Sequence, residues 1–233
     1  MIRHVRAGDH FRHENGWLTA RWHFSFGDYH DLDNVSFGPL RVFNDDRVRP
    51  GRGFDMHSHR DMEIITCVFA GRLEHEDSSG NRGILEPGDV QVMSAGSGIV
   101  HSERNPSDSE LLHFSQIWLT PWRRGGDPRY AQKKFPHEAR AGRLVPVVSR
   151  EAKAPGTLPI HQDAFIYLAD LGPGESATHE LRQARGAYVF LATGSASVNG
   201  IEVGAGDAVR IREEPAVILG GGRDARFVLI DLV

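Results

Sequence analysis

The apolar positions of this 233-residue chain fall in short runs bounded by Gly, Pro, Asn and Asp, and long helical patterns are scarce. Short runs with turn residues between them are typical of an all-β sandwich or barrel. We therefore predict an all-β chain. The clearest runs are 40–43, 62–69, 90–93, 112–119, 164–168, 188–191, 208–211 and 227–232.

Two segments of the chain, 70–93 and 193–211, follow the same pattern. Each has a Gly turn, two short strands around a Gly hairpin, and then Gly-Asp before another strand. A repeat of this kind indicates two copies of one β-barrel. We predict an N-terminal domain over 1–125, a linker over 126–158 and a C-terminal domain over 159–233. Because the linker is rich in Pro, Gly and charge, we expect little regular structure there beyond a short helix near 127–133.

Composition excludes several classes of protein. The net charge of −4 and the lack of long basic runs argue against nucleic-acid binding. The single cysteine, Cys67, lies in an apolar run, so we expect a buried thiol and no internal disulfide. No apolar stretch approaches the roughly 20 residues of a membrane span, and no signal peptide is evident. We expect a cytoplasmic monomer, and the excess of Arg over Lys is typical of a bacterial gene.

The sharpest chemical feature is the pair His57-Ser58-His59. In a strand, residues i and i+2 point to the same face, so the two imidazoles project together. Two imidazoles on one face are suitable donors for a transition metal. The spacing alone is a weak signal, because the chain has 13 histidines and a chance pair on a polar face looks the same.

A second pair, His101-Ser102-Glu103, follows the glycine-rich stretch 96–98. The same alternation places one imidazole and one carboxylate on a common face. The glycines suit a tight turn that brings one strand end close to another. This pair is also weak alone, because a Glu two residues after a His is common by chance.

Together the two pairs predict a metal centre in the first barrel. We expect His57, His59, His101 and Glu103 to bind one divalent ion per chain. Three neutral imidazoles and one carboxylate suit iron(II), our first choice, and also manganese, nickel, cobalt, copper or zinc. Four protein ligands leave two positions of a six-coordinate ion open for substrate and dioxygen, whereas a structural zinc site is closed and more often uses Cys.

These stretches resemble the two motifs of the cupin superfamily, the first through Gly51, His57, His59 and Glu63 and the second through Gly98, His101 and Asn105. Two positions depart from the pattern. Gly96 replaces a usual Pro, and Glu103 adds a carboxylate beside the second motif's His. The cupin pattern allows three or four residues between the His pair and its Glu, and here there are three. Because a shift of one residue turns a strand side chain to the other face, Glu63 is not carried over as a ligand. Glu103 then supplies the carboxylate, as it does in pirins.

Several further phrases, mostly in the first half of the chain, are similar to the pirin family. They are Gly16-Trp17-Leu18, His23-Phe24-Ser25-Phe26, Arg41-Val42-Phe43-Asn44-Asp45-Asp46, His57–Ile64 and Met93–Glu103. The resemblance implies two tandem cupin-type β-barrels in one chain, each a jelly-roll-like double-stranded β-helix. It also implies flavonol (quercetin) 2,3-dioxygenase activity with loss of carbon monoxide, with a flavonol and O2 as partners and Glu103 as general base.

The resemblance leaves two alternatives. Some pirins are described as regulators that bind protein partners, with the metal as a redox sensor. A cupin enzyme acting on another substrate is the other, since a fold does not determine a function.

The remaining candidates carry weaker expectations. Gln116 alternates with apolar neighbours, which would allow it to face the cavity and bind a substrate. We expect His75, His113, His161 and His179 to make ordinary polar contacts. We expect Trp17, Trp22, Phe24 and Phe26 to serve core and flap packing and not to form a substrate cage. The second repeat keeps one histidine, His179, and has no His-x-Glu after 211. We therefore expect its barrel to hold no metal.

Overall fold

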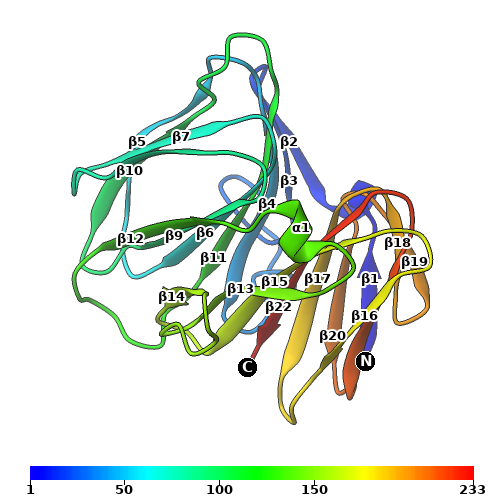
Figure 1. Ribbon diagram of the computed structural model, residues 1–233. Helices are drawn as coiled ribbons and strands as arrows, with labels where there is room; N and C mark the ends of the chain where they lie inside the picture. The colour runs from blue at the N-terminus through cyan, green and yellow to red at the C-terminus, as the bar shows by residue number, and fades with distance from the viewer. The chain divides into compact units, whose positions relative to one another are not determined.

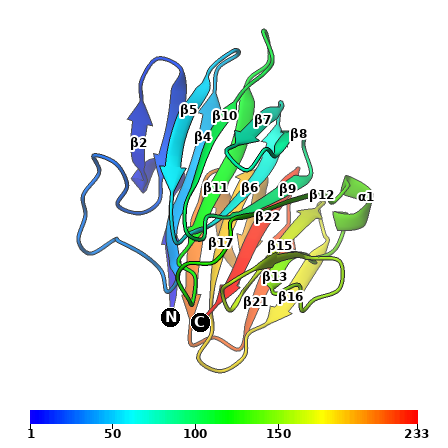
Figure 2. The same ribbon diagram turned by 90° about the vertical axis from the view of Figure 1, so that its left-hand side faces the viewer.

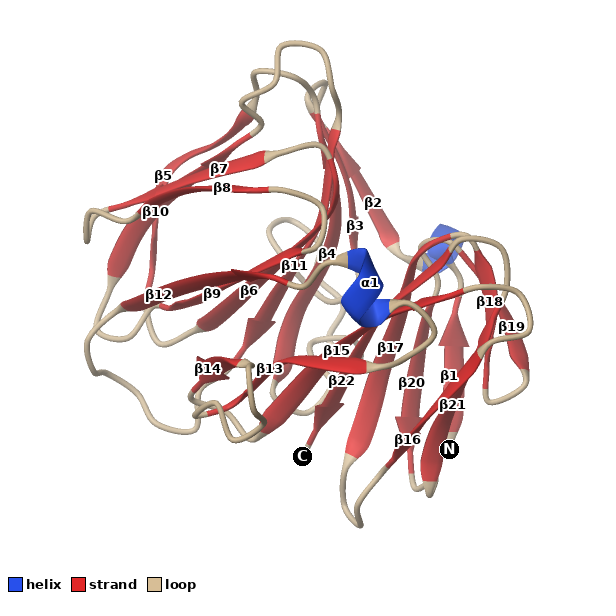
Figure 3. Cartoon of the chain, in the orientation of Figure 1, coloured by secondary structure: helices blue, strands red, loops and turns tan.

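The computed structural model describes residues 1–233, and almost all of its regular structure is β-strand (Figure 3). The all-β prediction is confirmed. Alternation explains the strands locally: in β3 (Leu18–Trp22) the first, third and fifth side chains are buried and those between them are half-exposed. The helical elements are a 3-10 turn and one short α-helix, η1 (Ala7–Asp9) and α1 (His137–Arg140). No helix is long and apolar enough to span a membrane.

Residue contacts divide the chain into two units, described separately below. The N-terminal unit comprises Phe11–Lys134 and Leu158–Gln162. The C-terminal unit comprises Met1–His10, Phe135–Thr157 and Asp163–Val233.

The N-terminal unit contains a seven-stranded and a four-stranded antiparallel sheet, with the orders β12-β9-β6-β11-β4-β3-β2 and β5-β10-β7-β8. In the smaller sheet, β5, β10 and β7 run side by side (Figures 1 and 2). The remaining strands of the larger sheet are β2 (Phe11–Glu14), β4 (Leu40–Val48), β6 (Glu63–Ala70), β9 (Asp89–Ser94), β11 (Leu112–Leu119) and β12 (Arg129–Lys134). The smaller sheet is built from β5 (Gly53–His59), β7 (Leu73–Asp77), β8 (Arg82–Leu85) and β10 (Ile99–Arg104).

The C-terminal unit repeats this design, which confirms the predicted second copy. Its strand orders are β1-β20-β17-β22-β15-β13 and β16-β21-β18-β19. The strands are β1 (Ile2–Val5), β13 (Val145–Arg150), β15 (Ala164–Leu171), β16 (Ser176–Glu180), β17 (Gly186–Thr193), β18 (Ser195–Val198), β19 (Ile201–Gly204), β20 (Ala208–Arg212), β21 (Ala216–Gly221) and β22 (Ala225–Leu232). Each unit is thus a cupin-type pair of sheets and not one closed sheet.

The observed units differ from the predicted domains at the N-terminus and around the linker. Residues 1–10, predicted in the N-terminal domain, belong to the C-terminal unit, because β1 pairs with β20 from Ile2↔Ile211 to Val5↔Ala208. Conversely, β14 (Leu158–Ile160) contacts β9 and β12 of the N-terminal unit. Contacts between segments that are distant in sequence decide these boundaries, and no local pattern encodes them.

The predicted linker also has more structure than expected, since β12, α1 and β13 all lie within 126–158. The short helix predicted near 127–133 is wrong. Arg129–Lys134 instead forms β12, which pairs along its whole length with β9, from Arg129↔Ser94 to Lys134↔Asp89. Its side chains are largely exposed, so no hydrophobic alternation marked it as a strand.

The interior of the N-terminal unit changes from apolar to polar along its strands. An apolar cluster includes Val48, Val68 and Phe114. On the same faces of these strands, two residues from Val48, Val68 and Phe114, lie three buried polar side chains: Asp46, Thr66 and Gln116. This polar end of the barrel is where the predicted metal ligands lie.

Candidate metal centre

The smaller sheet brings the two predicted motifs together. His57 and His59 lie on β5, and His101 and Glu103 lie on the adjacent strand β10. The strands pair antiparallel with His101 opposite His57, and the register shifts between His101 and Glu103. Because alternate residues of a strand share a face, all four side chains point into the barrel.

The three imidazoles form a compact group. Their ring centroids are 4.4 Å apart for His57 and His101, 4.8 Å for His57 and His59, and 4.9 Å for His59 and His101. One ring nitrogen from each lies within 4.8 Å of the others. His57 Nδ1 donates to the Asp55 carbonyl at 2.7 Å, which leaves Nε2 as a lone-pair donor. Three imidazole nitrogens can therefore meet at one ion.

Burial keeps two of these imidazoles neutral. It lowers the pKa of His59 to about 4, with smaller contributions from the neighbouring His101 and His57. Burial likewise lowers the pKa of His101 to about 3, aided by His57 and His75. A neutral imidazole is the form that ligates a metal, so no proton competes at neutral pH.

Glu103 lies beside this triad with its carboxylate engaged elsewhere. Glu103 Oε2 accepts a 2.7 Å hydrogen bond from Gln116 Nε2, and Oε1 lies 3.4 Å from the Thr66 hydroxyl. Thr66 in turn donates to Gln116 Oε1 at 2.8 Å. The structure thus groups the three histidines tightly and holds Glu103 in a buried amide–hydroxyl network. Gln116 faces the cavity as expected, but it binds Glu103.

His75 is the residue that the sequence analysis undervalued. It lies on β7, directly opposite Glu103 on β10, and it is fully buried. Its ring nitrogen joins His101 and Glu103 in a second cluster of metal-type donors. The alternation Leu73-Glu74-His75-Glu76-Asp77 shows that His75 shares a face with Leu73, but only the pairing of β7 with β10 reveals which residues it meets.

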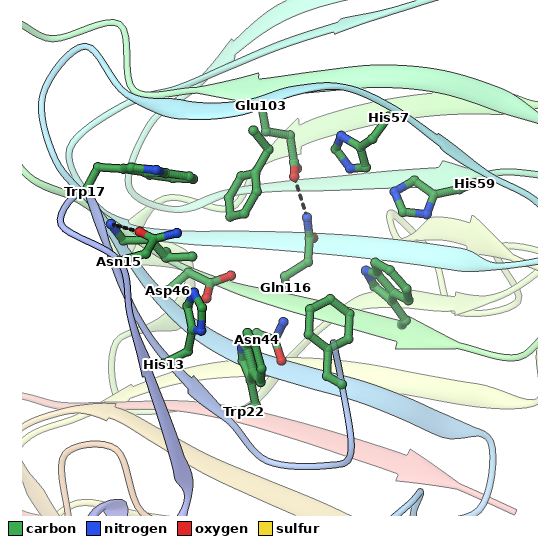
Figure 4. A pocket seen from close by; sticks show the side chains of 14 residues that line it. His13, Asn15, Trp17, Trp22, Asn44, Asp46, His57, His59, Glu103 and Gln116 are labelled. Atoms are coloured by element: carbon green, nitrogen blue, oxygen red, sulfur yellow. Dashed lines mark hydrogen bonds between the residues drawn. The ribbon is translucent and has the colours of Figure 1, made fainter. Parts of the chain in front are cut away.

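A cavity of about 350 Å³ opens beside the histidines, within the usual size range of small-molecule sites. Figure 4 shows His57, His59, Glu103 and Gln116 on one side of it. Its remaining walls are mainly aromatic, from Trp17, Trp22, Phe26, Phe54 and Trp118. Trp17, Trp22 and Phe26, expected to serve core and flap packing, do pack against the apolar cluster, and they also line this cavity. Phe24 is buried as expected.

Two other residues of the cupin motifs have structural contacts. Glu63 faces away from the histidines, because its neighbour Ile64 takes the inward face of β6. The Glu63 carboxyl accepts a 2.7 Å hydrogen bond from Ser94 Oγ, and burial raises its pKa. Asn105 donates to the carbonyls of Val48 and Glu110 and so ties down the segment after β10.

The corresponding end of the C-terminal unit offers one imidazole where the N-terminal unit offers three. His179 on β16 pairs with Val217 on β21, as His57 pairs with His101. Leu219 pairs with Val198, as Glu103 pairs with His75. Val217 and Leu219 on β21 thus occupy the positions that His101 and Glu103 occupy on β10. His179 Nε2 instead lies 2.7 Å from Asp231 Oδ2.

The residues of the N-terminal site fit a divalent metal. Besides the donor set itself, a second observation supports this fit: His101 Nε2 is buried and has no hydrogen-bond partner. An orphaned buried nitrogen is costly unless something fills its lone pair. A cation held by the three imidazoles would do so.

Known proteins resemble the chain over its whole length. The Pirin family model matches residues 4–119, and the model for the quercetinase C-terminal cupin domain matches residues 146–232. A pirin-like protein of Caulobacter vibrioides is 43% identical over 218 residues, covering 94% of each chain. Quercetin 2,3-dioxygenase of Escherichia coli (strain K12) is 39% identical over 233 residues, covering 100% of this chain and 99% of that one.

A solved structure shares the fold. The bacterial pirin YhhW from Escherichia coli, in complex with nickel(II), superposes with a TM-score of 0.93 and 38% identity, covering 100% of this chain and 99% of that one. The pirin resemblance seen in the sequence motifs is confirmed: this chain is a member of the pirin family, with two cupin domains.

Proposed function

We propose that this pirin is a metal-dependent dioxygenase that cleaves flavonols such as quercetin and releases carbon monoxide. The observation that carries the proposal is the group of three imidazoles that converge at the edge of an aromatic-walled cavity. The names of its relatives agree, since a protein 39% identical along the whole chain is called quercetin 2,3-dioxygenase.

We propose His57, His59, His101 and Glu103 as the ligands, with iron(II) as the ion. His101 belongs to both donor clusters, so it is the central member of the set. Glu103 would join by turning its carboxylate from Gln116 toward the histidines. The nickel complex of YhhW supports a divalent ion without selecting iron, because this donor set suits several metals.

Each group of the chain then has a chemical task. A bound divalent cation lowers the pKa of a ligated hydroxyl. Glu103 would accept the proton of the flavonol 3-hydroxyl as general base when its carboxylate leaves the ion and turns back to Gln116, whose 2.7 Å hydrogen bond then holds it. Trp17 and Trp22 bound the cavity, exclude water and hold the flat ring. In the overall reaction both atoms of O2 remain in the ester product, and carbon 3 leaves as carbon monoxide.

The test is to load the purified chain with iron(II), add quercetin in air, and record the loss of its visible absorbance together with carbon monoxide. We expect one mole of carbon monoxide per mole of quercetin consumed. Manganese, nickel, cobalt, copper and zinc are compared in parallel. If no metal gives turnover above that of free metal, the proposal is wrong.

Two substitutions separate ligation from catalysis. His101→Ala should lose the metal, measured by metal analysis after desalting. Glu103→Gln should retain the three imidazoles and lower kcat by about 100- to 10,000-fold, the usual contribution of a general base. His179→Ala, in the C-terminal unit, is the control and should change neither metal content nor turnover.

A further inference from the structure

Two polar side chains of β4 line the cavity and have no task in the chemistry above. Asn44 and Asp46 are separated by a single residue on the strand, so their side chains share a face and both point into the barrel, as Figure 4 shows. They are 4% and 3% exposed. The Oδ1 atom of each is buried and has no hydrogen-bond partner.

Unpaired buried oxygens are unusual, because each one costs the free energy of its lost hydration. Asp45, between them on the same strand, shows the ordinary case. It faces the other side of the sheet, and its carboxylate contacts His113 at 2.6 Å and Arg47 at 2.8 Å. The unpaired acceptors of this strand therefore lie on the cavity side alone.

No surrounding side chain donates to either oxygen in this structure. Gln116 pairs with Asn44 across the sheet, but its amide N–H donates to Glu103 and its amide oxygen accepts from Thr66. Trp22 pairs with Asn44 on the other side and presents an apolar ring to the cavity. The two oxygens face the cavity and are therefore available to accept from a ligand that occupies it.

We propose that Asn44 and Asp46 recognise ring hydroxyls of the substrate, so that the cavity selects polyhydroxylated planar phenols over bare aromatic rings of the same shape. Hydroxyl groups supply the O–H donors that the two oxygens lack. Burial raises the pKa of Asp46 well above its ordinary value, as do the charges of Asp45 and Glu103. A protonated Asp46 can also donate to a phenolic oxygen. The inference rests on the proposed function, because it assumes an aromatic substrate in this cavity.

The test compares quercetin with 3-hydroxyflavone, which has the same ring system but keeps only the 3-hydroxyl. Binding to the metal-loaded protein is measured without dioxygen, by quenching of tryptophan fluorescence. The variants are Asn44→Leu and Asp46→Leu, which preserve side-chain size. We expect each to weaken quercetin binding about 10- to 100-fold, the usual cost of an unpaired buried group. Binding of 3-hydroxyflavone should change less than about 3-fold.

Thermal unfolding distinguishes recognition from a structural role. Without ligand, Asn44→Leu and Asp46→Leu should keep or raise the melting temperature, because they remove unpaired buried atoms. Asp45→Leu is the matched control and should lower it. Equal weakening for both ligands, or none, would overturn the inference while leaving the proposed function intact. If the parent binds neither flavonol, the proposed function itself fails.

The buried residue His75 carries a separate inference. Its Nε2 lies 3.2 Å from Asp77 Oδ2, and its Nδ1 lies 3.5 Å from Nδ1 of His101. The other contacts of the Asp77 carboxylate are N–H donors of Ser79 and Asn81. Asp77 is thus surrounded by donors, and His75 Nε2 carries a proton toward it.

We infer that Asp77 and His75 position His101 and set its tautomer. If His75 donates through Nε2, its Nδ1 accepts from Nδ1–H of His101. The lone pair of His101 then resides on Nε2, the orphaned nitrogen available to the metal. Tyr130 stacks on the His75 ring, with the ring centroids 4.8 Å apart, and shields the hydrogen bonds from Asp77 to His101 from water. A carboxylate–histidine chain behind a ligand orients it and strengthens its binding. The inference rests on the proposed metal site.

His75→Leu and His75→Gln test this role. Gln can still accept from His101 and donate to Asp77, whereas Leu can do neither. We expect the nickel(II) dissociation constant to rise about 10- to 100-fold in His75→Leu and to recover most of that loss in His75→Gln. Nitrogen-15 NMR of the metal-free parent should show His101 protonated at Nδ1, and His75→Leu should shift the tautomer equilibrium.

His179→Leu is the control, since it removes another His–Asp pair and should leave nickel affinity unchanged. Parental affinity in His75→Leu would overturn the inference. Two nickel ions per chain, with one lost in His75→Leu, would make His75 a ligand and also overturn it. A parent that binds no metal would instead refute the proposed metal site.

Discussion

The Asp45 ion cluster should be a major source of stability in the N-terminal unit. Its carboxylate is 0% exposed and contacts three side chains, one from β4 itself and two from the neighbouring strands β3 and β11. Oδ1 accepts from His113 Nε2 at 2.6 Å, and Oδ2 faces Arg47 at 2.8 Å and Arg21 at 3.4 Å. The cluster thereby joins β3, β4 and β11, the strands that carry the cavity wall on their other face.

The perturbation is Asp45→Asn, which keeps the shape and removes the charge. Breaking a buried ion pair by neutralising one partner usually costs about 3–5 kcal/mol. His113 is nearly buried and the arginines are partly exposed, with side chains 9%, 28% and 31% accessible, so solvent relieves part of the loss. We therefore expect a decrease of about 3 kcal/mol in the free energy of unfolding.

The pH dependence gives a second, independent check. Burial alone raises the pKa of Asp45, but the hydrogen bond and charge of His113, followed by those of Arg47, outweigh it and hold the pKa well below 3.8. The folded-state pKa is thus lower than the unfolded one. The stabilisation is fully present above the unfolded pKa and is lost as pH falls toward the folded pKa.

The assay is urea unfolding of the metal-free parent and Asp45→Asn at pH 7 and 5, and then below pH 3.8. The difference in unfolding free energy between the parent and Asp45→Asn should be the same at pH 7 and pH 5 and should become smaller below pH 3.8. The control is Asp55→Asn, whose partner Arg104 is exposed, with an expected effect below about 1 kcal/mol. A difference below about 1 kcal/mol for Asp45→Asn at pH 7, or one that grows in acid, would refute the reasoning.

Three further predictions concern the site. Gln116→Leu leaves the Glu103 carboxylate without its 2.7 Å donor and should lower the unfolding free energy by about 1–3 kcal/mol in urea titrations; an unchanged value would show that Glu103 finds another donor. Gly53→Ala places a Cβ 2.2 Å from the Glu103 carbonyl oxygen and 2.6 Å from Arg104 Cα, so β10 must shift; we expect a loss of about 1–3 kcal/mol and weaker metal binding by calorimetry, and normal values would contradict the close packing. A divalent metal at 100 times its dissociation constant should stabilise the parent by about 2.7 kcal/mol, seen as a higher melting temperature that a chelator reverses and His101→Ala abolishes; stabilisation that persists in the variant would place the metal elsewhere.

The sequence alone determined the pairs of side chains that share a face. His57 with His59, and His101 with Glu103, follow from strand alternation, which is a local property of the backbone. The same alternation turns Glu63 to the opposite face of its strand, where its carboxyl contacts Ser94. The repeated Gly-Asp pattern was likewise sufficient to predict two copies of one fold.

Tertiary pairing decided what these faces meet. The register between β5 and β10 placed His101 opposite His57, and the pairing of β7 with β10 brought in His75. Pairing with β20 moved β1 into the C-terminal unit, and pairing with β9 made a strand of a polar segment. Hydrogen bonds between strands join residues distant in sequence, and their register depends on the whole sheet. A local pattern can therefore state which way a side chain points, but not which residues it contacts.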